Sequence, residues 1–199
     1  NHVMFNRRIV TAIATGTLAL SAVGIANAGN PLNPVPGKPG GQNIVLTAAG
    51  ANAQLGVFDY VLSAASCPGQ EIVVSILTGA DKVTLFAPTD AAFRDLLGID
   101  QPTGDEPRGE TFPCGAVPAD ALTNILAYHV TDGRRFSNSV FNRNSSKMVE
   151  MLNGQYIVTN PDLTISGNGN PDPVGVVAPF VNINASNGVI HTIDTVLQP

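Results

Sequence analysis

The chain has 199 residues, of which 44% are hydrophobic and 13% are charged, and its formal net charge is −5. This apolar share excludes a disordered chain, and the negative net charge argues against a generic nucleic-acid binder, which needs a basic surface. The length fits one domain with short appendages.

The first 28 residues are typical of a secretory signal peptide. Residues 1–3, at the start of this segment, look like a start-site artefact. An arginine pair at residues 7–8 comes before the uncharged run 9–23, and small residues at 26–28 offer a cleavage site. The run is shorter than the about 20 apolar residues of a membrane span, although an uncleaved anchor stays an alternative. We expect a secreted, periplasmic or cell-surface protein with no membrane span after cleavage. Loss of the two arginines would make the net charge −7.

Residues 29–42 are rich in proline and glycine and have no apolar period, which predicts an extended linker. We expect residues 43–199 to form a single folded domain, because they contain no internal repeat.

Apolar residues recur at helical spacing in four parts of the first half of this domain. The expected helices cover residues 55–65, residues 73–80, a segment that follows an N-cap at Thr89 or Asp90, and residues 118–129, with Pro118 at the first helical position. A buried strand is expected at residues 83–87, and a long loop containing glycine and proline at residues 98–117.

The second half alternates between apolar and polar residues, which is typical of strands. The expected strands cover residues 148–152, 156–159, 163–166, 174–177, 180–184 and 189–197. The first two flank Asn153-Gly154, a strong signal for a β-hairpin. Helices in the first half and mostly antiparallel strands in the second predict an α+β fold.

Cys67 and Cys114 are the only two cysteines. Export to an oxidising compartment favours a structural disulfide between them, worth ~4 kcal/mol for a loop of this length. A redox or metal-binding pair is the alternative, but the spacing matches neither a Cys-x-x-Cys site nor a zinc knuckle.

Three segments resemble the motifs of the fasciclin domain family. They are VTLFAPTDAAF at residues 83–93, ILAYHV at residues 125–130 and NGVIHTID at residues 187–194. The resemblance covers nearly all of residues 43–199. It implies a wedge of mostly antiparallel strands flanked by short helices, exported or anchored at cell surfaces. Members of the family mostly serve adhesion, matrix or carbohydrate contact, and no shared catalytic activity is implied.

The resemblance marks Thr89, Asp90, Tyr128, His129 and His191 as family-motif residues. His191 lies on the apolar face of the last predicted strand, and His129 follows a helical stripe. A buried, hydrogen-bonded histidine is the simpler interpretation at both positions, with a ligand-binding role as the alternative. Animal members of the family use the Tyr-His region in receptor contact, and Tyr128 and His129 match it.

We expect no catalytic residues, no metal site and no cofactor. The mature chain would hold two histidines, and its two cysteines are expected to form a disulfide, whereas a zinc site needs three or four ligands. The sequence has no Gly-x-Ser-x-Gly elbow, no phosphate-binding glycine loop and no His-Glu-x-x-His motif.

Arg134, Arg135, Arg143 and Lys147 fall within 14 residues that contain no acid, and they are half of the basic residues after residue 28. Because guanidinium groups bind carboxylate, sulfate and phosphate well, this candidate patch predicts docking of an anionic glycan or lipid headgroup. A solvated connection between elements is the alternative.

The sequence thus predicts a secreted, non-catalytic module for adhesion or matrix contact. Its expected partner is a cell-surface or matrix glycan or protein, with anionic polysaccharides as one class, and not a nucleic acid. The alternative is a carrier of a lipophilic small molecule such as a carotenoid, which a low-charge, apolar-rich chain would also suit.

Overall fold

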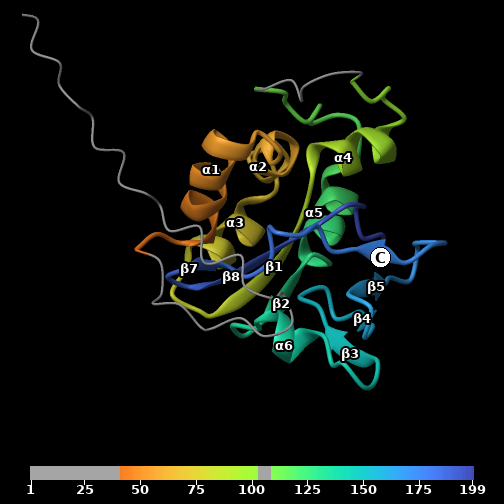
Figure 1. The fold of residues 1–199 in the computed structure, drawn as a ribbon. Helices are drawn as coiled ribbons and strands as arrows, with labels where there is room; N and C mark the ends of the chain where they lie inside the picture. The colour runs from red at the N-terminus through yellow and green to blue at the C-terminus, as the bar shows by residue number, and fades with distance from the viewer. Residues whose placement is uncertain (1–40, 103–108) are drawn as a thin grey trace, which may run out of the picture.

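The computed structural model describes residues 41–102 and 109–199. The expected signal peptide at residues 1–28 and nearly all of the expected linker at 29–42 lie outside the described residues, as does the middle of the 98–117 loop. In chain order the elements are α1 (Ile44–Leu55), α2 (Asp59–Ala65), α3 (Glu71–Thr78), β1 (Val83–Pro88), α4 (Asp90–Leu97), α5 (Ala119–Ala127), β2 (Val130–Asp132), α6 (Ser137–Val140), β3 (Lys147–Glu150), β4 (Tyr156–Thr159), β5 (Thr164–Ser166), β6 (Val174–Gly175), β7 (Ile183–Ala185) and β8 (Gly188–Ile193) (Figure 1).

The strands form two four-stranded sheets. The central sheet has the order β2-β1-β8-β7, and the outer sheet has the order β3-β4-β5-β6. Every neighbouring pair is antiparallel except β1 and β8, which run parallel with Val83 beside Gly188 and Pro88 beside Ile193. Helices in the first half and mostly antiparallel strands in the second confirm the α+β class.

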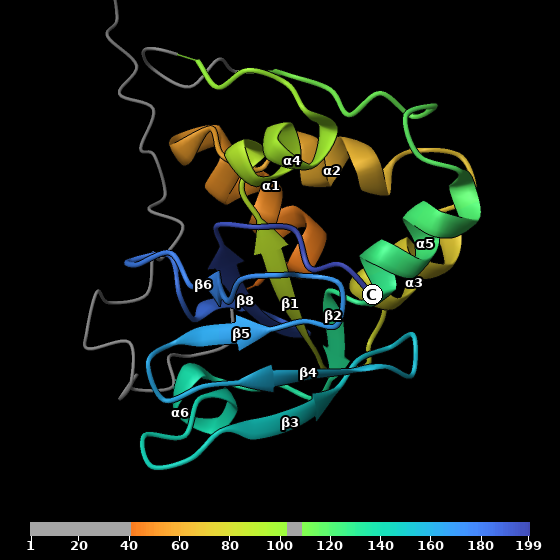
Figure 2. The same cartoon turned by 90° about the vertical axis from the view of Figure 1, so that its right-hand side faces the viewer.

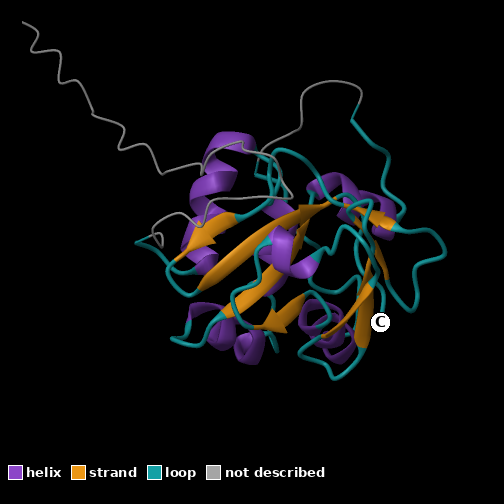
Figure 3. Cartoon of the chain, turned by 60° about the horizontal axis from the view of Figure 1, so that its bottom comes forward, coloured by secondary structure: helices purple, strands orange, loops and turns teal. Residues whose placement is uncertain are grey.

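The central sheet lies between two hydrophobic cores, because alternate residues of its strands point to opposite faces. On one face, Leu85 and Ile190 pack with the helices α1 to α5. On the other, Phe86 and Ile193 pack with the inner face of the outer sheet, including Ile157. Figure 2 shows the resulting layers, with α1, α2 and α4 above β1 and β8 and with β3 to β5 below them. Figure 3 shows strands running through the middle of the molecule with helices around them.

The helix predicted over residues 55–65 corresponds to α2, which begins at Asp59, so only its predicted start is wrong. Gly56 adopts a left-handed conformation with φ of 66° and ends α1, and α2 begins at Asp59. The helix α1 was not predicted, and it starts where the Asn43 side chain accepts the Leu46 N–H. Asn43 and Gly56 are typical start and stop residues, but the apolar stripe across them hid the boundary.

The other predicted elements are largely confirmed, with shifted ends. Thr89 is the N-cap of α4, and its hydroxyl accepts the Ala92 N–H at 3.3 Å. Pro118 is the N-cap of α5 instead of its first helical residue. The hairpin at Asn153-Gly154 is present, and Gly154 has a φ of 80° that favours glycine. The short elements β2 and α6 were not predicted, since three or four residues carry too little periodicity.

Candidate functional site

Tyr128 lies at the C-terminal end of α5 and is fully buried. Its phenol donates to the Tyr156 carbonyl at 2.9 Å and accepts the Asn168 N–H at 3.1 Å. Burial raises the pKa of the phenol, which therefore stays protonated and keeps both bonds. Tyr128 thus joins α5 to β4 and to the loop after β5, and its side chain is covered in the folded protein.

His129 is buried between α5 and the C-terminal segment. Its Nε2 accepts the Leu197 N–H at 2.9 Å, so the proton is on Nδ1, which donates to the Ile125 carbonyl at 2.8 Å. Burial lowers the pKa of His129 to about 4. Both ring nitrogens are used within the fold, and the imidazole is neutral at physiological pH.

His191 lies on β8 and, like His129, is buried with both ring nitrogens hydrogen-bonded. Its Nδ1 accepts the Asn182 N–H at 3.4 Å, and its Nε2 donates to the Arg135 carbonyl at 2.8 Å. The rings of Phe86 and Phe141 lie 5.7 and 6.4 Å from the imidazole, centroid to centroid. Burial lowers the pKa of His191 to about 4 as well. This geometry holds the ring in the second core and leaves no nitrogen for a ligand.

Asp90 begins α4 and is 1% exposed, which is unusual for a carboxylate. Its Oδ1 accepts the Tyr60 N–H at 2.8 Å and so connects α2 to α4, whereas its Oδ2 has no hydrogen-bond partner among the described residues. Burial raises the pKa of Asp90 to about 6, against the pKa-lowering effect of the Tyr60 N–H.

The shifted pKa values of His129, His191 and Asp90 make the free energy of unfolding depend on pH. The unfolded chain binds more protons on His129 and His191 between pH 6.5 and about 4, so their contribution is complete above pH 6.5 and is lost as the pH falls. Asp90 has the opposite sign, because the folded state holds its proton between pH 6 and 3.8. We expect a net loss of roughly 3 kcal/mol of unfolding free energy between pH 7 and pH 4.5. Urea unfolding followed by tyrosine fluorescence measures it, since the chain has no tryptophan.

The variant Asp90→Asn separates the contribution of Asp90 from that of the two histidines. It removes the group that offsets the histidines, and the loss of stability on acidification should become steeper than in the wild type. Equal unfolding free energies at pH 7 and pH 4.5 in this variant would contradict the assignment of buried, neutral histidines.

Arg94 is a charged residue on α4, yet it is only 1% exposed. Its Nε donates to Glu110 Oε2 at 3.1 Å, and its terminal nitrogen binds the same oxygen. The guanidinium also lies 5.8 Å from the centroid of the Tyr60 ring. Glu110 belongs to the loop at residues 98–117, so this ion pair fastens the loop to α4. No sequence signal marked Arg94, since an arginine in an amphipathic helix is usually exposed.

The same loop is held at four further points. The Gly109 N–H donates to Asp59 Oδ2 at 2.6 Å, and the Phe112 N–H donates to Ser63 Oγ at 2.8 Å. The Phe112 ring packs edge-on against Phe93 with centroids 5.8 Å apart. The expected disulfide between Cys67 and Cys114 is present. The described end of the loop is therefore anchored on α2 and α4.

The four cations of the candidate patch do not form one group. Arg134 donates to Asn184 Oδ1 at 2.7 Å and to the carbonyls of Ala185 and Ser186 at 2.6 and 2.9 Å. It therefore holds the turn between β7 and β8. Arg135 donates through Nε to the Asp132 carbonyl at 2.7 Å. Both arginines therefore use donors on hydrogen bonds to the central sheet and its β7–β8 turn.

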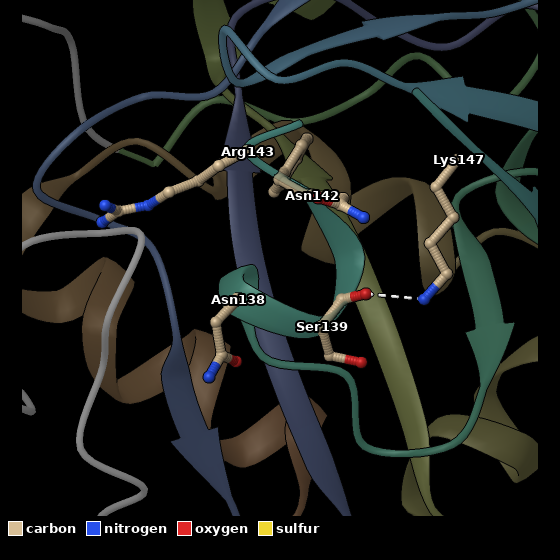
Figure 4. A pocket seen from close by; sticks show the side chains of 6 residues that line it. Asn138, Ser139, Asn142, Arg143 and Lys147 are labelled. Atoms are coloured by element: carbon tan, nitrogen blue, oxygen red, sulfur yellow. Dashed lines mark hydrogen bonds between the residues drawn. The ribbon is translucent and has the colours of Figure 1, made fainter. Parts of the chain in front are cut away.

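Arg143 and Lys147 line a pocket of about 530 Å³ between α6 and β3 (Figure 4). Lys147 Nζ donates to the Ser139 carbonyl at 2.7 Å, which leaves it two more donors. Arg143 is exposed and forms no hydrogen bond or ion pair with a described residue. In Figure 4 the guanidinium and the ammonium lie on opposite sides of the pocket.

The rest of the pocket is neutral and polar. Asn138, Ser139 and Asn142 supply amide and hydroxyl groups, the buried Phe141 also lines the pocket, and no lining residue is acidic. Figure 4 shows the two asparagine side chains between the two cations. These neutral residues were not predicted as site residues, because polar residues near a short, unpredicted helix resemble those of any solvated loop. The volume falls within the range of small-molecule sites.

A second cavity is apolar and much smaller. It is bounded by the helices α1 to α5 and the strands β1 and β2 and has a volume of about 30 Å³. That is room for about one water molecule, roughly a tenth of the smallest usual ligand pocket. This cavity is too small for a molecule of carotenoid size.

No group of three or more histidine, cysteine, aspartate or glutamate side chains in residues 41–102 and 109–199 could hold a metal ion. In the same ranges, no helix is both long and apolar enough to cross a membrane.

A family model described as the fasciclin domain matches residues 69–199. The immunogenic proteins MPB70 of Mycobacterium bovis and MPT70 of Mycobacterium tuberculosis are each 28% identical to this chain over 173 residues, covering 86% of this chain and 77% of theirs. A solved FAS1 domain pair from the insect cell adhesion molecule fasciclin I is 18% identical, with a TM-score of 0.44. That match covers 64% of this chain and 40% of the insect chain, less than half of its length.

Proposed function

Because the chain belongs to the fasciclin domain family, we propose that it is a non-catalytic extracellular contact module that binds an acidic polysaccharide of a cell surface or matrix. The match to the fasciclin domain model over residues 69–199 supports this proposal, because the family is generally of the adhesion type. The observation that carries the choice of partner is the polar pocket lined by Arg143 and Lys147.

The chemistry of this pocket suits a polyhydroxylated anion. Arg143 offers a planar fork for a carboxylate or sulfate, and the amides of Asn138 and Asn142 can bind sugar hydroxyls. The two cationic groups lie on opposite sides of the pocket (Figure 4), so they favour a chain with repeated charges over one small anion. A chain that spans the pocket would meet a positive charge at each end and neutral polar groups between them.

Only two of the four cations of the candidate patch, Arg143 and Lys147, belong to the proposed binding site. Arg134 uses its guanidinium on three acceptors of the β7–β8 turn, and Arg135 is bonded to a backbone carbonyl. Donors that already hold the fold contribute less to a partner, because a partner would have to replace these bonds.

An extracellular location has independent support in the disulfide. Cys67 and Cys114 are bonded, and disulfides persist mainly in oxidising compartments. The export segment expected from the sequence at residues 1–28 agrees with this location.

Binding to immobilised alginate and heparin, measured as a function of salt, tests the proposal. We expect Arg143→Ala and Lys147→Ala to weaken binding about fivefold each, or ~1 kcal/mol. Lys82→Ala is the matched control, because it removes one positive charge from an exposed side chain whose only hydrogen bond within the described residues goes to the Ser186 carbonyl. Binding should fall as salt rises, and the neutral polymer dextran should not bind.

Two results would reject the proposal. One is the absence of binding to both polyanions at low salt. The other is an equal loss in Lys82→Ala and Arg143→Ala, which would indicate a general charge effect instead of a pocket.

A further inference from the structure

The helix α6 forms one wall of the polar pocket, because Asn138 and Ser139 lie on it and Phe141 follows it directly (Figure 4). The helix has only four residues, and its N-cap residue Phe136 makes no side-chain capping bond. A helix of about one turn gains too little from its own hydrogen bonds to be stable alone. Contacts with the rest of the fold therefore hold α6 and, with it, this wall of the pocket.

Asn182 supplies the contacts at the start of α6. Its Oδ1 accepts the Ser137 N–H at 2.7 Å, and its Nδ2 donates to Ser137 Oγ at 3.0 Å. Asn182 precedes β7, is 7% exposed and has a φ of 61°, a left-handed conformation that few residues other than glycine adopt. Such a conformation persists only where the surrounding contacts determine it, and it is found most often at functional positions.

His191 contacts three parts of the same region. Its Nδ1 accepts the Asn182 N–H at 3.4 Å, and its Nε2 donates to the carbonyl of Arg135, which precedes α6. Its ring also lies edge-on to Phe141, which lines the pocket. One buried imidazole therefore contacts the residue that fixes the start of α6, the chain that enters the helix and the residue that follows it.

His191 has no acidic partner to compensate a positive charge on its ring. Its aromatic neighbours are Phe86 of β1 and Phe141, both residues beside it on β8 are uncharged, and no acidic side chain in the described part of the chain forms an ion pair with it. Arg135, whose carbonyl it binds, is itself a cation, and its guanidinium is bonded to a carbonyl of β2. A proton on Nδ1 would thus be unpaired and would face the Asn182 N–H, donor against donor.

We propose that acid releases the polysaccharide from the pocket through His191. A proton on Nδ1 breaks the bond to Asn182, which loosens the start of α6 and the wall formed by Asn138 and Ser139. This inference rests on the proposed function and adds its regulation. Burial lowers the pKa of His191 to about 4, so the ring is neutral and the wall is intact at neutral pH. By linkage, a bound polysaccharide also disfavours protonation of His191.

The affinity for heparin between pH 7 and pH 3.5 tests this inference, because the sulfates of heparin stay charged throughout this range. Protonation of surface carboxylates makes the protein less negative, which by itself would strengthen binding. We expect the opposite, a loss of about fourfold at pH 3.5, which is the factor for a group of pKa about 4 that must be neutral for binding. Circular dichroism at each pH verifies that the protein is folded.

NMR spectra of the ¹⁵N-labelled protein give a second measurement that needs no ligand. The amide shifts of Ser137 and Asn138 should titrate with the same midpoint as the ring of His191, because protonation of the ring changes the contacts at the start of α6. Amide shifts at these two positions that do not follow His191 would overturn the inference.

The variant His129→Gln is the matched control. It removes the other buried histidine, which bonds to Ile125 and Leu197 and not to α6, so it should keep the loss of heparin affinity in acid. Asn182→Gly removes both bonds to Ser137 and suits a φ of 61°. It should bind heparin more weakly at pH 7 and lose most of the pH dependence, because the start of α6 is already released.

The outcomes separate this inference from the proposed function. If heparin binds through Arg143 at pH 7 but its affinity is unchanged or higher in acid, the inference fails and the proposed function stands. A fourfold loss in acid that persists in Asn182→Gly, or that disappears in His129→Gln, would also overturn the inference. If heparin does not bind at pH 7, both fail.

Discussion

Replacing Arg94 with alanine should lower the free energy of unfolding by about 4 kcal/mol, the largest effect of any single substitution considered. The side chain is almost completely buried, and it is the only cation paired with Glu110 in the described structure. Alanine would leave a cavity and would leave the buried carboxylate of Asp90 without the favourable field of Arg94. Urea unfolding at pH 7 measures this loss.

A second variant separates the charge from the volume. Arg94→Met combined with Glu110→Gln keeps most of the bulk and removes both members of the ion pair, so we expect a smaller loss than in Arg94→Ala. Arg135→Ala is the control for removing an arginine that is only half-buried. Equal stability of Arg94→Ala and the wild type would contradict a structural role for the pair of the buried Arg94 with Glu110.

Removing the disulfide should also cost about 4 kcal/mol. Cys67 and Cys114 are 47 positions apart, and the segment between them includes α3, β1 and α4. The bond restricts this long segment in the unfolded chain, which is the main source of its stabilisation in the chain-entropy account. The double variant Cys67→Ala with Cys114→Ala avoids a free thiol, and its urea midpoint should fall while binding at the pocket of Arg143 stays unchanged.

Reduced wild-type protein is the matched sample for that variant. It should lose a similar amount of stability, because the covalent link is the common difference. A loss well below 1 kcal/mol in both samples would show that Glu110 and Phe112 hold the loop without the disulfide.

Local signals account for the parts of the fold that the sequence predicted well. The Asn153-Gly154 pair fixes the β3–β4 hairpin, and Thr89 starts α4, because each depends on a few neighbouring residues. The break between α1 and α2 was missed, although Gly56 marked it, because apolar residues continue across it. The parallel pairing of β1 with β8 joins segments about 100 residues apart, and no local pattern carries that information.

The candidate site was also predicted only in part from the sequence. The sequence grouped four cations by their proximity along the chain, and only Arg143 and Lys147 line the pocket. The acceptors that engage Arg134 lie at Asn184 to Ser186, some 50 residues away, and come beside it only through the central sheet. Burial of Arg94 depends likewise on Glu110, in a loop whose path is set by tertiary contacts.

The most direct test of the account is an NMR titration of the ¹⁵N-labelled protein with an acidic oligosaccharide. We expect amide shifts to change at residues 138–147, around the pocket. Shifts centred on Arg134 and the β7–β8 turn, with residues 138–147 unchanged, would contradict it.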